Sequence, residues 1–262
     1  MYQPLSLKQR LKAGERLHGC WIEAFSPIMT EIVAQSGYDV AMIDLEHGPG
    51  STMDAVRQLQ VLAAYDCAPL IRVPSADSNV IKKAMDIGPG GLMIPDIRTV
   101  RQARDVVSAC RYGPRGSRGA APALVRASGY GRNLERYLAG VDDGFLVIGQ
   151  IESREGAGNI DGISGVDGLD MLFVGPSDLS ASLGALGDFA SEEFGETFSN
   201  LERAILDAGK WLGCIPFHDR DAARLYENGH HLVISGVDTL LLREAAETDV
   251  MNLNRSKVGD PA

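Results

Sequence analysis

Eight short apolar segments, separated by longer stretches of helical periodicity, extend along almost the whole chain. They read GCWIEAF, VAMIDLEH, PLIRV, GLMIPDI, LVIGQIES, LDMLFVGP, WLGCIPF and HLVISGV, in that order. Apolar residues fill most of each segment, which is typical of parallel strands that are buried on both faces. Eight such strands with intervening helices in 262 residues predict an α/β protein with one (β/α)8 TIM barrel.

The stretches between these segments carry apolar residues at helical spacing. Helices are predicted over Pro27–Ser36, Thr52–Tyr65, Asn79–Ile87, Thr99–Cys110, Glu192–Ala208, Arg220–Asn228 and from Thr239 onward. The alternative fold, an open doubly wound sheet, predicts a glycine-rich phosphate-binding turn after the first strand. The first strand instead ends in EAFSP, and no GxGxxG motif occurs, so the barrel is favoured.

The chain is predicted to form a single domain over residues 1–262, with its core at about 18–250 and a flexible tail at 255–262. A short amphipathic helix is expected at the N-terminus, with Leu5, Leu7 and Leu11 facing inward. Residues 111–144 form the longest segment without predicted structure. Loops of such length are usually functional, so part of this one is expected to reach the mouth of the active site.

Composition and charge restrict the partners that the protein could have. The formal net charge is -10, which disfavours nucleic acid and anionic membrane surfaces. No apolar stretch approaches the length of about 20 residues that a membrane helix needs, and the polar N-terminus does not resemble a signal peptide. The four cysteines are far apart and in apolar contexts, which predicts free thiols and a cytoplasmic location.

Polar residues interrupt the apolar pattern where several predicted strands end. In a TIM barrel the carboxyl ends of the strands meet at one face, where the active site lies. Four strand ends would therefore bring carboxylates, a histidine, an arginine and a glutamine together. These residues are Asp44, Glu46, His47, Arg72, Gln150, Glu152, Ser177 and Asp178. Trp21 and Glu23, on the first strand, are expected to form core and pocket wall.

Glu152 and Asp178 come from neighbouring strands, and two adjacent carboxylates do not both stay ionised without a cation. Either one of them holds a proton or both bind a metal ion. Oxygen ligands without cysteine favour a hard ion such as Mg²⁺ or Mn²⁺. Two protein ligands would leave coordination positions open for substrate.

His47 is the expected proton-transfer group, because its ordinary pKa of about 6.5 lies near neutral pH. Asp86 and Asp44 are both candidates to orient it. Arg72 has the fixed charge that a developing enolate oxygen requires. An imine mechanism needs a lysine at a strand's carboxyl end, but Lys210 precedes its strand and no other lysine fits.

The segments GYDVAMIDLEHGP, LIRV, KKAMDIG, MIPDIRT, ARDVVSACRYGPRGSRG, QIES, VGPSDLSASLG and GVDT resemble the HpcH/HpaI family of class II pyruvate aldolases. Members include 4-hydroxy-2-oxoheptanedioate aldolase and 2-dehydro-3-deoxyglucarate aldolase. The resemblance implies a reversible aldol addition of pyruvate, or of an analogue such as hydroxypyruvate, to an aldehyde. It also implies a divalent metal ion (Mg²⁺, Mn²⁺ or Co²⁺) and a hexamer whose C-terminal helix is exchanged between subunits.

The same resemblance implies a role for each motif residue. Glu152 and Asp178 would bind the metal, while Gln150 would line the pyruvate pocket. Backbone N–H groups around Gly175, Ser177 and Asp178 would hold the pyruvate carboxylate. Arg72 would also contact pyruvate and stabilise the enolate oxygen. His47, paired with Asp86, would transfer protons with a water molecule. Independently of the resemblance, Asp44 and Glu46 are expected to hold the neighbouring side chains and the loop in place without reacting.

Two other functions are compatible with such a barrel. A magnesium-dependent acyl-CoA lyase, of the citrate lyase β-subunit or malyl-CoA lyase type, would need a basic patch for the CoA phosphates. Arg111, Arg115 and Arg118 are the only basic cluster expected near the mouth. A non-catalytic binding barrel would lack part of the catalytic set, which is complete here. His218, at the end of the seventh strand, could contact substrate.

Overall fold

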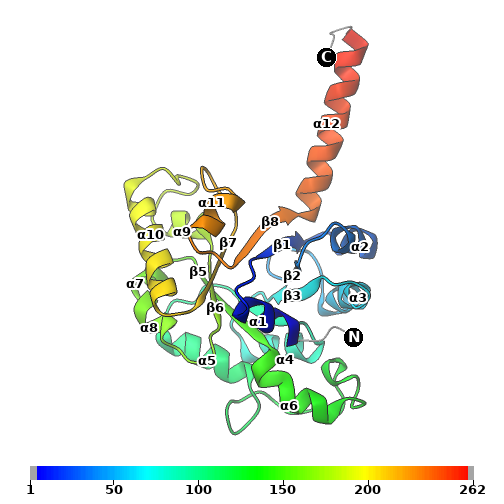
Figure 1. Ribbon diagram of the computed structural model, residues 1–262, viewed down its shortest axis with the longest axis vertical. Helices are drawn as coiled ribbons and strands as arrows, with labels where there is room; N and C mark the ends of the chain where they lie inside the picture. Colours follow the sequence, from blue (N-terminus) through cyan, green and yellow to red (C-terminus); the bar gives the residue numbers. More distant parts are fainter. Residues whose placement is uncertain (1–4, 259–262) are drawn as a thin grey trace.

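The computed structural model describes residues 5–258, and its eight parallel strands close into a barrel in chain order (Figure 1). This confirms the predicted TIM barrel. The strands are β1 (Leu17–Ile22), β2 (Val40–Asp44), β3 (Ala68–Arg72), β4 (Gly91–Ile94), β5 (Leu146–Ile151), β6 (Met171–Val174), β7 (Trp211–Cys214) and β8 (Leu232–Val237).

Helices follow the strands and cover the outside of the barrel (Figure 1). They are α1 (Leu5–Lys12), α2 (Pro27–Gln35), α3 (Thr52–Leu62), α4 (Ser78–Asp86), α5 (Val100–Cys110), α6 (Leu134–Gly144), α7 (Arg154–Gly158), α8 (Ile160–Ser164), α9 (Pro176–Ser182), α10 (Glu192–Asp207), α11 (Ala222–Glu227) and α12 (Asp238–Val258). Most begin at a polar side chain, such as the reciprocal Ser51–Asp54 capping box of α3.

The alternation of side chains along each strand produces two separate cores. On β2, Val40 and Met42 belong to the cluster inside the barrel, whereas Ala41 and Ile43 belong to the cluster between strands and helices. Successive strand residues point to opposite faces, so one parity of each strand faces the barrel axis. This parity determines which residues beyond each strand end face the axis.

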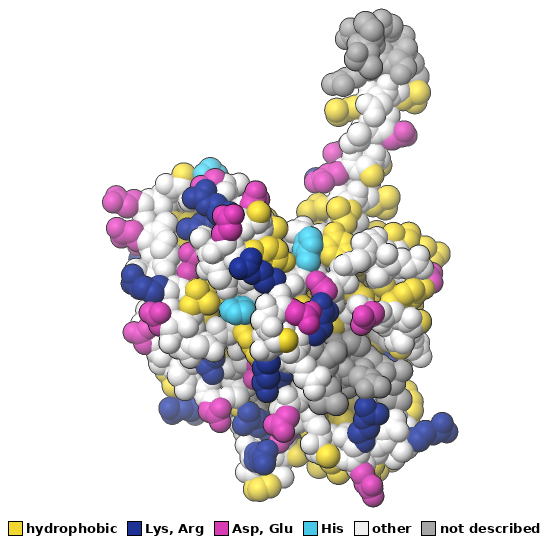
Figure 2. Space-filling view, viewed as in Figure 1, with side chains coloured by type: hydrophobic (Ala, Val, Ile, Leu, Met, Phe, Trp, Pro, Cys, Tyr) yellow, Lys and Arg dark blue, Asp and Glu magenta, His cyan; other side chains and the backbone are white. Residues whose placement is uncertain are grey.

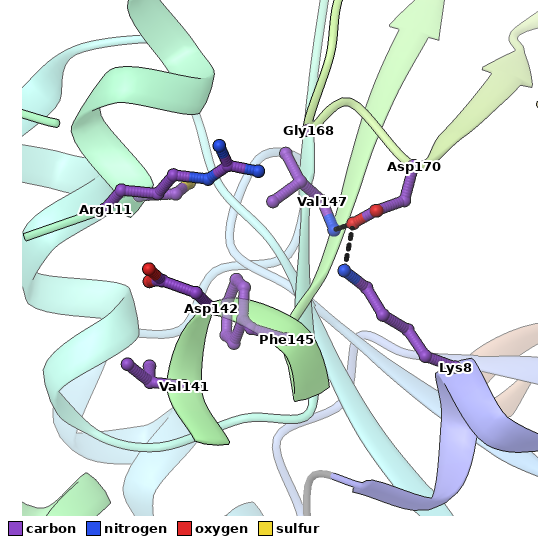
Figure 3. Close-up of a pocket in the computed structure, with 9 residues that line it drawn as sticks. Lys8, Arg111, Val141, Asp142, Phe145, Val147, Gly168 and Asp170 are labelled. Carbon is purple, nitrogen blue, oxygen red and sulfur yellow. Dashed lines mark hydrogen bonds and ion pairs between the residues drawn. The ribbon is translucent and has the colours of Figure 1, made fainter. Parts of the chain in front are cut away.

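The N-terminal end of the barrel is closed by α1. Leu7 and Leu11 are buried in the inner cluster, as predicted, and the side chain of Leu5 lies outside the described part of the chain. Lys8 pairs with Asp170 at 2.8 Å, and Asp170 also accepts a hydrogen bond from the Val147 backbone (Figure 3). These contacts hold α1 across the end opposite the predicted active site.

Residues 111–144 do not reach the predicted active-site mouth in this chain, so that expectation is wrong. The segment contains a short 3₁₀ helix at Arg126–Ser128 and helix α6, and it follows the C-terminus of α5. Arg126 donates to the carbonyl of Ile87, just after α4, and so packs the segment against the end of that helix. A loop that joins a barrel helix to the next strand lies at the N-terminal end of the barrel.

Helix α12 projects away from the barrel instead of packing along it (Figure 1). Every side chain from Thr239 to Asn254 is exposed. The helix runs through residues 255–258 of the proposed tail, and residues 259–262 lie outside the described part of the chain. No described helix is long and apolar enough to span a membrane.

Candidate active site

The carboxyl ends of the strands form a layer of polar side chains above the inner core. Asp44, Arg72 and Gln150 have the same parity as the inner-core residues of their strands. Glu152 follows β5 with the same parity. The predicted site residues of β2, β3 and β5 therefore share one layer at the catalytic end of the barrel.

Arg72 is held rigidly in this layer. Its Nε and Nη2 donate to the two carboxylate oxygens of Asp44 at 2.9 and 2.6 Å, and its Nη1 lies 3.1 Å from Glu46. The guanidinium also lies over the indole ring of Trp21, 4.2 Å from its centroid. Burial alone would lower the pKa of Arg72, but these carboxylates raise it above its ordinary value. Arg72 is therefore a fixed cation whose geometry is set by three neighbours.

The loop after β2 carries Glu46 and His47 and is shaped by Asp44. The fully buried Asp44 carboxylate accepts hydrogen bonds from the backbone N–H groups of Glu46 at 3.0 Å and His47 at 3.4 Å. Gly48 lies against Phe25, where a Cβ would come within 2.7 Å of the ring. His47 is exposed at this end of the barrel. Asp44 therefore orients Arg72 and the His47 backbone.

Glu152 is buried, and both of its carboxylate oxygens are engaged. Oε1 accepts from the backbone N–H of Asp96 at 2.9 Å, and Oε2 accepts from Gln150 Nε2 at 2.9 Å. Burial, followed by the charge of Asp178, raises the pKa of Glu152 to about 7. Gly175 packs against this carboxylate, because a Cβ there would lie 2.7 Å from Oε2.

The carboxylates of Glu152 and Asp178 fit a divalent cation. Burial and then the charge of Asp178 raise the pKa of Glu152, and a positive ion between the two carboxylates would oppose both effects. Within residues 5–258, no group of three or more His, Cys, Asp or Glu side chains is placed to hold a metal. A metal ion held between them would have these two carboxylates as protein ligands and keep its remaining coordination positions open.

Ser177 and Asp178 lie in the first turn of α9, immediately after β6. Backbone N–H groups in a first helical turn have no acceptor within the helix. Both side chains are exposed at the catalytic end, and Gly175 precedes them. The residues that the sequence assigns to metal and carboxylate binding are therefore adjacent in the fold.

Asp86 does not lie near His47 in this chain, and the predicted pairing is not seen. Asp86 is the last residue of α4, which runs from the catalytic end back to the N-terminal end of the barrel. Its carboxylate accepts from the buried Arg118 at 2.6 Å. His47 follows the carboxyl end of β2, whereas Asp86 ends the helix that precedes β4, so the two residues lie at opposite ends of the barrel.

Two contacts of the site are not evident from the sequence. Trp21, a residue of the inner core, also supports Arg72 through its ring. Asp96, which pairs with Arg98 in the loop after β4, also positions Glu152 through its backbone N–H. The alternation of side chains along β1 is the sequence signal that would predict Trp21 inside the barrel. A backbone contact across strands has no counterpart in the sequence.

Backbone strain collects at the same end of the barrel. Among the described residues, four non-glycine residues have positive φ, and three of these, Phe25, Asp96 and His218, lie just beyond the ends of β1, β4 and β7. Such conformations persist only where the surroundings fix them, and they are common at functional sites. The strained residues thus mark the end of the barrel that carries the polar layer.

The profile of the HpcH/HpaI aldolase/citrate lyase family matches residues 17–245. The chain belongs to this family. Its resemblance to the HpcH/HpaI family in sequence is thereby confirmed, together with the expectation of an aldolase, a carbon–carbon lyase.

Curated members of the HpcH/HpaI family are similar over almost the full length. The chain is 40% identical to the 2-keto-3-deoxy-L-rhamnonate aldolase of Klebsiella pneumoniae, with 92% of this chain and 90% of the relative covered. It is 39% identical to the hydroxypyruvate/pyruvate aldolase of Deinococcus radiodurans, with 95% and 92% covered.

A solved structure of the HpcH/HpaI family also has this architecture. The family protein from Burkholderia cenocepacia superimposes with a TM-score of 0.90 at 34% identity, covering 95% of this chain and 99% of the other.

Proposed function

We propose that the protein is a class II aldolase that adds the enolate of pyruvate, or of an analogue such as hydroxypyruvate, reversibly to an aldehyde. The observation that carries this proposal is the buried Glu152 beside Asp178, in the same catalytic layer as the rigid Arg72. The relatives named as aldolases of 2-keto-3-deoxy-L-rhamnonate and of hydroxypyruvate or pyruvate support the donor assignment.

Glu152 and Asp178 would hold the divalent ion, Mg²⁺, Mn²⁺ or Co²⁺. When bound, this ion would act as a Lewis acid on the keto group of the donor. Gln150 supports the site from the buried side, because its amide N–H fixes Glu152 Oε2 while its own Oε1 has no hydrogen-bond partner among the described residues. That oxygen would line the proposed donor pocket.

Arg72 would face the oxygen that becomes negative as pyruvate enolises. Its guanidinium is already pinned by Asp44, Glu46 and Trp21, so little rearrangement is needed when the charge appears. The backbone N–H groups of Ser177 and Asp178 would receive the donor carboxylate. Because Gly175 has no side chain, the space beside Glu152 would remain free for the metal ion and the donor carboxylate.

His47 would move the proton at the reacting carbon or at the aldehyde oxygen. It projects from the loop that Asp44 fixes, and its side chain is exposed at the catalytic end. Asp86 of the same chain does not orient it. A pairing with Asp86 would require that residue to come from another subunit.

The acyl-CoA lyase alternative lacks its phosphate site. Arg118 is buried against Asp86, Arg115 lies 3.3 Å from Asp142, and Arg111 packs against Gly168. All three follow α5 and lie at the N-terminal end of the barrel. No basic cluster remains near the catalytic mouth among these candidates, which favours the aldolase.

Exchange of pyruvate methyl protons with deuterium tests the proposal directly. Exchange should require Mn²⁺, Co²⁺ or Mg²⁺ and stop with EDTA, whereas borohydride trapping of an imine would contradict it. Glu152→Ala should abolish metal binding, and His47→Ala should keep the metal but slow exchange. Glu155→Ala, which removes an exposed carboxylate a short way along the chain, is the matched control.

We further propose a cytoplasmic homohexamer in which α12 is exchanged between subunits. Leu240, Leu241, Leu242, Val250 and Met251 are 43–61% exposed on a helix that does not pack along its own barrel. Figure 2 shows apolar side chains gathered where this helix leaves the barrel. The four cysteines are free and buried, which fits a reducing compartment.

Truncation after Val237 tests the assembly. The truncated chain should lose the hexameric mass in light scattering, since the exposed apolar face of α12 would no longer be available to a second subunit. An unchanged mass would contradict helix exchange.

A further inference from the structure

Glu23 lies at the catalytic rim of the barrel, on its inner wall. It directly follows β1, and it has the same parity as Trp21, which belongs to the inner core. The register that pairs Ile22 with Ile43 places Glu23 level with Asp44 on the neighbouring strand. The Glu23 side chain is half-buried, and its register beside Asp44 places it next to the proposed donor site, on the β1 side.

The Glu23 backbone is held by hydrogen bonds, but no described cation forms a salt bridge with its carboxylate. Its N–H donates to the buried Asp238 at 3.0 Å, and Asp238 also accepts from Ala24. Glu23 Oε2 accepts from the Thr239 hydroxyl at 3.4 Å. No described residue donates a hydrogen bond to Oε1 or forms a salt bridge with Glu23.

Two of the three charged groups that act on Glu23, Asp44 and Asp238, are negative, and the third is Arg72. Burial, then the charges of Asp44 and Asp238, raise the pKa of Glu23 above its ordinary value. Arg72, the nearby cation, contacts Asp44 and Glu46, and in the proposed function it serves the donor oxygen and not the acceptor tail. An anionic group entering beside Glu23 would find no free cation there to pair with.

The space left for the aldehyde lies on the side of the barrel mouth where Glu23 is found. If the proposed function holds, the donor occupies the sector of β5 and β6 with Arg72 on β3. The part of the barrel mouth that would face the aldehyde is then formed by the ends of β7, β8 and β1. Ile215 and Val237 are its apolar residues, packed on the inner core, and Glu23 is its charged residue.

We propose that Glu23 determines acceptor specificity: it excludes aldehydes with a terminal carboxylate and accepts short neutral hydroxyaldehydes. A carboxylate tail would meet a like charge at the rim, whereas a hydroxyl could donate to Oε1. Ile215 and Val237 provide apolar surface for the carbon chain. This inference rests on the proposed function and adds the substrate class.

Two acceptor pairs test the role of Glu23 in aldol additions with pyruvate: glyoxylate against glycolaldehyde, and 4-oxobutanoate against butanal. Each pair compares a charged with a neutral aldehyde of equal length. The difference in intrinsic reactivity between the two aldehydes is the same for every variant, so it cancels when their charged-to-neutral ratios are compared. Glu23→Gln should raise the charged-to-neutral ratio of kcat/KM by at least about tenfold, the scale of a like-charge contact near a protein surface. Glu135→Gln, which removes an exposed charge from α6 at the other end of the barrel, should leave the ratio unchanged.

Salt provides a second test that needs no variant. Rising ionic strength should increase the wild-type ratio for charged acceptors, because exposed charges are screened. The role of Glu23 would be overturned if neither Glu23→Gln nor salt changed the charged-to-neutral ratio of kcat/KM while the protein still exchanged pyruvate protons. Absence of exchange in the wild-type protein would instead overturn the proposed function.

Discussion

The Asp44–Arg72 pair is the most strongly buried charge contact of the candidate site. The side chains are 0% and 11% exposed, and two hydrogen bonds join them at 2.9 and 2.6 Å. Asp44→Asn keeps the shape of the side chain but removes its charge. Arg72 then keeps only Glu46 as an ionic partner, and one of its N–H groups faces the amide instead of an anion.

The expected cost follows from these contacts. A hydrogen bond to a charged group contributes about 1.5–3 kcal/mol, and breaking a buried pair on one side costs about 3–5 kcal/mol. Because the substituted amide still offers one acceptor and Glu46 remains, we expect a loss of about 3 kcal/mol in the free energy of unfolding. That corresponds to a melting temperature lower by roughly 6 °C or more for a chain of this size.

Thermal unfolding and pyruvate proton exchange measure the two consequences of Asp44→Asn. The melting temperature should fall as stated, and exchange should slow because Arg72 is no longer pinned. Asp105→Asn is the matched control, since it breaks a 3.8 Å pair with Arg101 whose side chains are 73% and 92% exposed. If both variants melted within about 1 °C of the wild type, the argument for a rigid Arg72 would be refuted.

Three further predictions concern other parts of the barrel. The metal-free protein should lose stability as the pH rises from about 4.5 to about 7, because folded Glu152, with a pKa of about 7, holds a proton that the unfolded chain releases. Thermal melts of wild type and Glu152→Gln should diverge in this window, and Mn²⁺ affinity measured by calorimetry should rise across it. Gly175→Ala should weaken Mn²⁺ binding at least about tenfold, since its Cβ would lie 2.7 Å from Glu152 Oε2; unchanged affinity would contradict that geometry. Lys210→Met should retain proton exchange but lose about 1–3 kcal/mol of stability, because Lys210 Nζ donates to the carbonyls of Val166 and Leu169 at the N-terminal end.

The residue types of the candidate site could be predicted because barrel strands impose a simple rule. An apolar strand that ends in carboxylates, as in QIES or DLEH, brings them to the catalytic face whatever the rest of the chain does. For this reason Glu152, Asp44 and Arg72 lie at the predicted end. The burial of the four cysteines could be predicted for a similar reason, since each lies within an apolar stretch.

Hydrophobic periodicity is a local property of the chain, so the order of the eight strands and the end of the barrel that carries the polar strand ends can be derived from the sequence. Which charged side chains meet depends on the three-dimensional structure. Asp44 binds Arg72, Asp86 binds Arg118 at the opposite end, and residues 111–144 pack on the end of α4. Such pairings depend on the length and direction of the helices between strands, and these distances in space cannot be derived from residue spacing along the chain.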